Sequence, residues 1–179
     1  MKLILLFRDP VERAFSHWRM RWRSTAEGLL NGDPPEEMTF DQAVRQRQLQ
    51  PQTQSEVPSL NRFSSYVDRG LYGLQTQHLL TVFPREQLLL SDFDLLVHRP
   101  RDVLRQVADF LCVDAERFPV DVVIHENAAA PGGYPSALDE IDVSALHELF
   151  RSDLEVFQQL SGLDISHWPT LRAGSPHSS

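Results

Sequence analysis

Short apolar runs alternate with longer amphipathic stretches along the chain, which is the pattern of an α/β layer fold. Leu3 to Phe7 is a continuous apolar run of strand length, typical of a strand buried on both faces of a parallel sheet. Leu88 to Leu90 is a shorter run that we expect in the same sheet. Val120 to Ile124 is either a third strand or an extended segment.

Amphipathic stretches predict the helices between these runs. The first covers about residues 10–23, and a second over 39–48 begins with Thr39 and Gln42 at the spacing of a capping box. Further helices are expected over residues 60–67, 71–83, 101–111 and 142–161. Residues 24–37 are predicted to be a loop, residues 49–58 a mobile segment and residues 169–179 a disordered tail. The remaining 1–168 are expected to form one domain.

Composition narrows the function classes. A length of 179 residues with 41% hydrophobic residues suits one domain with a usable core. Seventeen Lys and Arg against 25 Asp and Glu give a formal charge of −8, which disfavours binding to nucleic acid or anionic membrane. The single cysteine, Cys112, excludes an intramolecular disulfide and favours a reducing, cytoplasmic location. No run is long enough to span a membrane, and the seven histidines lack metal-ligand spacing.

The junction between the first strand and the first helix carries the candidate chemistry. Arg8 follows the strand, Asp9 is a suitable N-cap, and Pro10 sits where a first-turn proline is tolerated. A helix N-terminus offers free N–H groups and a positive dipole end, and an arginine offers a planar fork that matches phosphate oxygens. Ser16 adds a hydroxyl on the same helix. These residues therefore predict a phosphate site, although Arg8 alone could be an ordinary strand-end charge.

This junction resembles a known family motif. Residues 7–16, FRDPVERAFS, resemble the 3′-phosphate-binding motif R-[ND]-P-x-x-R-[AL]-x-S of sulfotransferases that use 3′-phosphoadenosine 5′-phosphosulfate (PAPS). Later segments resemble that family in its own order, and together the resemblance covers about Leu3 to Trp168. Those segments are residues 66–72, 79–88, 93–111 and 132–135.

The resemblance implies a three-layer, parallel-sheet fold of the P-loop-NTPase-like sulfotransferase type. It implies that Arg8 and Ser16 hold the 3′-phosphate of PAPS, with no metal cofactor, and that Tyr72 and the loop of Gly132, Gly133 and Tyr134 line the nucleotide. The implied reaction transfers a sulfuryl group to a hydroxyl or amine of a small-molecule or saccharide acceptor. No catalytic residue is assigned.

Two parts of the family pattern lie outside this sequence. The family's first strand, with the Gly/Ser/Thr loop that cradles the 5′-phosphosulfate, and its general base both precede the 3′-phosphate motif, whereas Met1 here opens directly on that motif. We therefore expect the chain to correspond to the C-terminal two-thirds of a sulfotransferase domain, N-terminally incomplete through truncation, a mis-called start or gene decay. An exposed sheet edge beside the first strand and weak or no activity follow as expectations. The alternative is a non-catalytic nucleotide-binding or interaction domain of the same descent.

Several of these residues also have ordinary structural interpretations. Tyr72 could belong to the core, and Gly132 to Tyr134 could be a plain turn without any basic residue of its own. Cys112 is interpreted as a small buried residue where relatives usually carry glycine. His17, one position after Ser16 on a helix, is expected to face elsewhere than Ser16.

Overall fold

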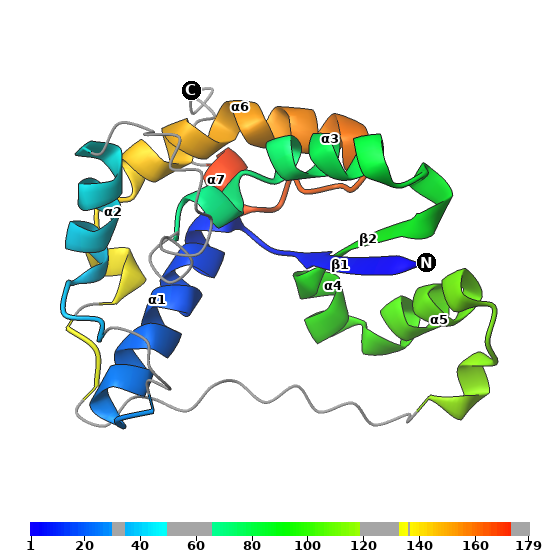
Figure 1. Ribbon diagram of the computed structural model, residues 1–179, viewed down its shortest axis with the longest axis horizontal. Helices are drawn as coiled ribbons and strands as arrows, with labels where there is room; N and C mark the ends of the chain where they lie inside the picture. Colours follow the sequence, from blue (N-terminus) through cyan, green and yellow to red (C-terminus); the bar gives the residue numbers. More distant parts are fainter. Residues whose placement is uncertain (30–34, 50–65, 119–132, 136, 173–179) are drawn as a thin grey trace, which may run out of the picture. The chain divides into compact units, whose positions relative to one another are not determined.

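The computed structural model describes residues 1–29, 35–49, 66–118, 133–135 and 137–172 (Figure 1). The chain divides into two compact units. Of the described residues, the first unit holds 1–9, 72–118 and 151–172, and the second holds the others. The assignment of residues 1–168 to a single domain stays a prediction.

A parallel pair of strands forms the sheet of the first unit. β1 (Leu3–Phe7) pairs with β2 (Leu88–Asp92), in a register that places Leu3 opposite Leu88 and Phe7 opposite Asp92. Both apolar runs therefore form strands of one parallel sheet, as the sequence predicts.

The two strands differ in burial. Leu88 and Leu90 on β2 are buried, whereas Ile4 and Leu6 on β1 are 42% and 47% exposed. Within the described residues β1 pairs with β2 alone, so one edge of β1 is open. The side chains on one face of β1 are only partly covered. The prediction that this strand is buried on both faces is wrong for the described structure, because an apolar run reports strand propensity but not how many neighbours cover the strand. The expected exposed edge of β1 is found among the residues that the structure describes.

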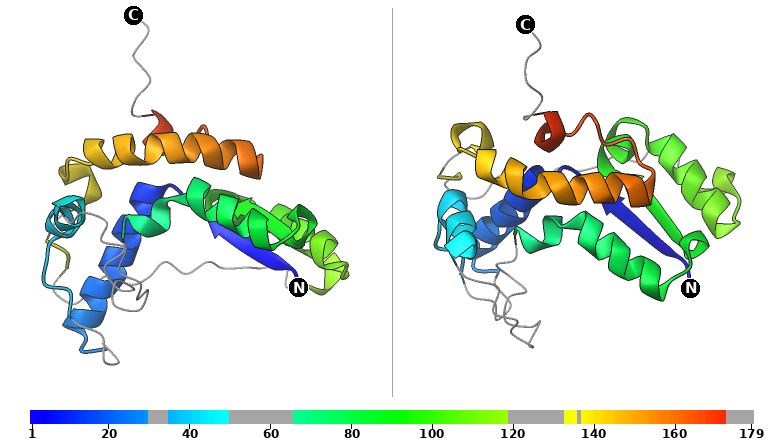
Figure 2. Two further views of the ribbon diagram at one scale, coloured as in Figure 1. Left: turned by 45° about the horizontal axis from the view of Figure 1, so that its top comes forward. Right: turned by 90° about the horizontal axis from the view of Figure 1, so that it is seen from above.

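Helices lie on both sides of this sheet (Figures 1 and 2). On one side, α3 (Tyr72–Val82) and residues 151–161 of α6 (Ser144–Ser161) pack on β1, where the Phe7 ring lies 4.6 Å from that of Phe157. On the other side lie α4 (Phe93–His98) and α5 (Pro100–Leu111). Short 3₁₀ turns η2 (Arg85–Gln87) and η3 (Ala115–Arg117) precede β2 and follow α5. The first unit is thus a three-layer α/β arrangement.

A carboxylate from α6 completes the start of α3. The backbone N–H groups of Gly73 and Leu74, in the first turn of α3, donate to the Asp153 carboxylate at 2.8 and 2.9 Å. Asp153 supplies this helix cap because Leu71, the residue before the helix, has no side-chain acceptor. A Cβ on Gly73 would collide with the Asp153 carbonyl oxygen. Glycine at this position therefore sets how closely α3 and α6 approach.

The C-terminal segment is ordered farther than predicted. Residues 169–179 were expected to be a disordered tail, but α7 (Pro169–Arg172) is helical, and Thr170 is fully buried. The backbone N–H of Thr170 donates to the Asp9 carboxylate at 2.8 Å, which fixes this turn to the end of β1. Residues 173–179 lie outside the described part of the chain.

The second unit is helical. It contains α1 (Pro10–Ala26), α2 (Phe40–Leu49), the turns η1 (Asp68–Gly70) and η4 (Leu138–Glu140), and residues 144–150 of α6. Its core gathers large aromatic side chains with almost no exposure. They are Trp18, Phe40, Tyr66 and Phe150. The predicted capping box is present, since the backbone N–H of Thr39 donates to the side-chain Oε1 of Gln42 and the backbone N–H of Gln42 donates to the Thr39 hydroxyl.

Most other element predictions agree within a few residues. Helix α1 extends three residues beyond the expected end, and α6 ends at Gly162, which has a φ of 71°. The predictions for residues 50–58, 60–65 and 120–124 fall outside the described residues. No helix in the described ranges is both long and apolar enough to cross a membrane.

Cys112 is exposed rather than buried. It ends α5 in the left-handed conformation, with φ 59° and ψ 45°, and its backbone N–H donates to the carbonyls of Ala108 and Asp109. The residue after a helix commonly adopts this conformation, which glycine meets most easily. The prediction of burial fails because the position is a helix cap at the surface.

Candidate functional site

Arg8 lies at the carboxyl end of β1, where the sequence predicts it. Its side chain is half-buried, and its guanidinium carbon lies 5.4 Å from the centre of the Phe93 ring at the start of α4. An aromatic face beside a guanidinium supports its positive charge through a cation–π contact. The position suits an arginine that binds an anion at the end of the sheet.

Tyr72 belongs to the core but also touches the candidate site. Its hydroxyl donates to the backbone carbonyl of Arg8 at 3.0 Å, and its ring lies edge-on to that of Phe7. The side chain is 4% exposed. Tyr72 therefore holds the main chain at Arg8, while its predicted contact with a nucleotide stays a prediction.

The C-terminal segment holds the carboxyl ends of both strands. Thr170 binds Asp9 after β1, and the indole N–H of Trp168 donates to Asp92 at the end of β2 at 3.3 Å. Asp9 and Asp92 are each almost completely buried. The sequence does not predict these contacts, because no pattern near Asp9 or Asp92 indicates that residues 168–170 pack against them.

Ser16 lies half-buried on α1, in the second unit. The neighbouring His17 packs edge-on against the Tyr66 ring at 4.9 Å, and Arg13 donates to the Tyr66 backbone carbonyl. The Tyr66 hydroxyl in turn donates to Glu36, so these side chains form one network around α1. Because Arg8 belongs to the first unit, a joint role of Arg8 and Ser16 stays a prediction.

The described part of the predicted nucleotide loop lies on α1. The Tyr134 ring is 6.1 Å from that of Trp18 and 4.5 Å from the guanidinium carbon of Arg19. Gly133 is exposed with a φ of 78°, while Gly132 lies outside the described residues. The loop has no basic residue of its own, yet α1 places Arg19 against it. Sequence reasoning missed Arg19, although its spacing of three from Ser16 puts both on one helix face.

Burial and the positive charge of neighbouring arginines alter the pKa of His17 in this unit. Burial, assisted by the positive charges of Arg13, Arg69 and Arg21, lowers the pKa of His17 from 6.5 to about 4. An imidazole that is harder to protonate in the folded state stabilises the protein above pH 6.5, and this contribution is lost as the pH falls from 6.5 towards 4.

We therefore expect the His17 ring resonances in NMR spectra to stay those of the neutral form down to about pH 5. Unfolding in urea between pH 6.5 and 4 should show a steeper loss of stability for the native chain than for His17→Gln. A His17 that titrates near pH 6.5, or equal pH dependence in both proteins, would contradict the lowered pKa.

Comparison with known proteins decides the family. The family model described as a sulfotransferase domain matches residues 1–128, which is more than half of the chain. The chain belongs to the sulfotransferase family. Its matched part contains Arg8, Ser16 and Tyr72.

A solved structure supports this sulfotransferase assignment and the fold. The sulfotransferase from Alicyclobacillus acidocaldarius is 26% identical in sequence, and the superposition has a TM-score of 0.60. The match covers 93% of this chain and 57% of that one. The present sulfotransferase chain thus spans little more than half the length of this relative. A search of curated proteins found no match.

Proposed function

We propose that this sulfotransferase takes part in sulfuryl transfer from PAPS to a hydroxyl or amine of a small-molecule or saccharide acceptor, and that Arg8 binds the 3′-phosphate of the donor. The observation that carries the proposal is the placement of Arg8. It stands at the carboxyl end of β1, half-buried over Phe93, with its carbonyl fixed by the Tyr72 hydroxyl. Ligands of open α/β sheets bind outside the carboxyl ends of the strands.

The proposed roles follow from donor chemistry. Arg8 offers a bidentate, permanently charged fork, which matches two oxygens of a phosphate dianion. Ser16 offers a hydroxyl to the same phosphate. Tyr72, Gly132, Gly133 and Tyr134 are proposed to line the nucleotide, with Arg19 supplying positive charge beside Tyr134 at 4.5 Å.

In the proposed reaction, the acceptor oxygen or nitrogen attacks sulfur while the bond between sulfur and the 5′-phosphate oxygen breaks. The acceptor proton passes to a base, and 3′-phosphoadenosine 5′-phosphate leaves. Positioning and stabilisation of charge on the leaving phosphate carry most of such catalysis. The residues proposed for this chain bind and orient the donor; the base and the leaving-group ligands are not assigned to it.

The second candidate is a domain of the same descent that binds the nucleotide without turnover. A transfer assay with labelled PAPS and a panel of sugar, phenol and amine acceptors separates the two candidates. It should be run on this chain and on a version extended with a family N-terminal segment.

Calorimetry tests the 3′-phosphate assignment itself. We expect 3′-phosphoadenosine 5′-phosphate to bind at least about tenfold more tightly than adenosine 5′-phosphate, because only the former offers a partner for a charge-assisted pair of hydrogen bonds. Both titrations use the same chain and buffer, with salt held constant because it screens these contacts. Equal affinities for the two nucleotides would remove the assignment.

A further inference from the structure

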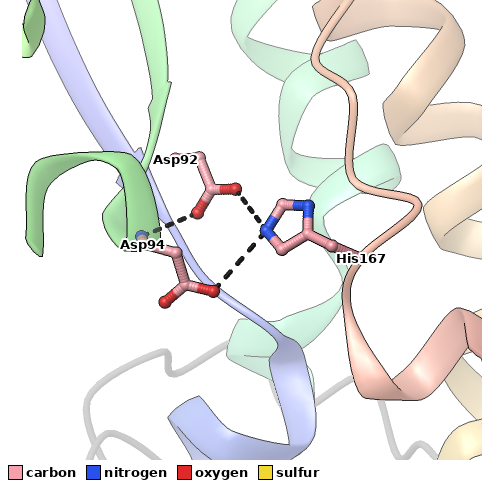
Figure 3. Close-up of side chains that lie close together, drawn as sticks. All are labelled: Asp92, Asp94 and His167. Carbon is pink, nitrogen blue, oxygen red and sulfur yellow. Dashed lines mark hydrogen bonds and ion pairs between the residues drawn. The ribbon is translucent and has the colours of Figure 1, made fainter. Parts of the chain in front are cut away.

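Asp92, Asp94 and His167 converge on one point in the first unit (Figure 3). The His167 Nε2 lies 3.0 Å from Asp92 Oδ2 and 3.5 Å from Asp94 Oδ2, and the three ligand atoms all lie within 4.8 Å of one another. The geometry points to a divalent-cation site formed by these two carboxylates and this imidazole. It joins the C-terminal segment to the end of β2.

The Asp92 carboxylate is held in place before any ion arrives. Asp92 is the N-cap of α4, and its Oδ1 accepts the backbone N–H of Asp94 at 2.9 Å. This turn sets both carboxylates towards His167, as Figure 3 shows. The indole N–H of Trp168 donates to Asp92 Oδ2 at 3.3 Å, and Trp168 is fully buried. A ligand oxygen that is itself hydrogen-bonded is the usual arrangement around protein metal ions.

A hydrogen bond alone does not account for the cluster. The Nε2 atom carries at most one proton, which the nearer Asp92 oxygen can accept, yet the Asp94 oxygen faces the same nitrogen from 3.5 Å. Two carboxylates face one imidazole, whose single positive charge when protonated matches only one of them. A divalent cation would neutralise both carboxylates and take the Nε2 lone pair, so that each group gains a partner.

The ligand set and its exposure indicate the class of ion. Imidazole nitrogen with carboxylate oxygen suits Zn²⁺ or Mn²⁺, whereas Mg²⁺ and Ca²⁺ prefer oxygen ligands alone. Asp92 is buried, but the side chains of Asp94 and His167 are 40% and 38% exposed, so an ion can enter from solvent. The expectation that the chain binds no metal came from the family resemblance and from the spacing of its histidines. Spacing along the sequence cannot reveal ligands drawn from two distant segments.

The test is equilibrium dialysis of the full 179-residue chain against Zn²⁺ and, separately, Mn²⁺, followed by metal analysis. We expect saturable binding of one ion per chain and a higher thermal unfolding midpoint with the bound ion. Asp94→Asn and His167→Gln should each weaken binding by at least about tenfold. His98→Gln is the matched control, because His98 is exposed at the end of α4 and lies outside the cluster. Circular dichroism verifies that each variant is folded.

Nitrogen NMR of His167 distinguishes a metal ligand from a simple ion pair. A shift of Nε2 on addition of Zn²⁺ that saturates with the dialysis curve supports the site. Absence of saturable binding, unchanged affinity in Asp94→Asn, or an imidazole that responds to pH but not to metal would overturn it. Nucleotide titrations in the presence of a chelator keep this outcome separate from the proposed function.

Discussion

Replacing Trp168 with alanine is expected to destabilise the first unit by about 3–5 kcal/mol, which is the usual cost of removing a large aromatic side chain from a core. Trp168 is fully buried, and its ring stacks on that of Phe157 at 6.2 Å and lies edge-on to Tyr72 at 6.1 Å. The change would also leave the buried Asp92 carboxylate without its indole donor. Urea unfolding followed by circular dichroism measures the loss.

Two variants separate packing from hydrogen bonding. Trp168→Phe keeps a ring but removes the N–H, and we expect it to recover most of the stability and to cost about 1–3 kcal/mol. Trp22→Ala, at a half-buried position on α1, should cost less than Trp168→Ala. If Trp168→Ala lost less than about 1 kcal/mol, the C-terminal segment would not be part of the core of the first unit.

Replacing Arg8 with alanine is expected to weaken binding of 3′-phosphoadenosine 5′-phosphate by about 1.5–3 kcal/mol, or roughly 10- to 160-fold. The change would remove the pair of charge-assisted hydrogen bonds that we propose between Arg8 and the 3′-phosphate. The Arg8 backbone is held through its carbonyl by Tyr72, so truncating the side chain leaves the strand end in place. Isothermal titration calorimetry measures the affinity.

Three comparisons make the Arg8 result specific. Adenosine 5′-phosphate, which lacks the 3′-phosphate, should bind the native chain and Arg8→Ala with similar affinity. Arg8→Lys should recover only part of the loss, because an ammonium keeps the charge but not the planar fork. Arg101→Ala, at an exposed position on α5, should change neither affinity. An Arg8→Ala protein with native affinity for both nucleotides would move the phosphate site elsewhere.

Much of the local structure was predictable because the relevant signals are local. The apolar runs at β1 and β2 and the stripes of α1, α3, α5 and α6 depend on periodicity within single elements. The start of α2 and the end of α6 follow from Thr39 and Gly162, which act through their own neighbours in the chain. The placement of Arg8 directly after a parallel strand follows in the same way.

The missed features all depend on partners distant in the sequence. The exposure of Ile4 and Leu6 depends on what packs over that face of β1, and an apolar run carries no information about its cover. Asp92, Asp94 and His167 meet only because the chain returns to β2 after α6. Likewise, Asp153 caps a helix whose own preceding residue cannot, so the signal lies in α6 rather than in α3.

The contact between Thr170 and Asp9 also has a consequence for folding. These residues are 161 positions apart, so forming the contact between them closes a loop that contains most of the 179 residues. Such non-local contacts are formed against the entropy of loop closure and slow folding. During synthesis β1 emerges long before Phe157, Trp168 and Thr170, so the apolar side chains of β1 stay uncovered until these residues are made. The nascent chain is therefore open to mispairing along β1 until residue 170 has left the ribosome.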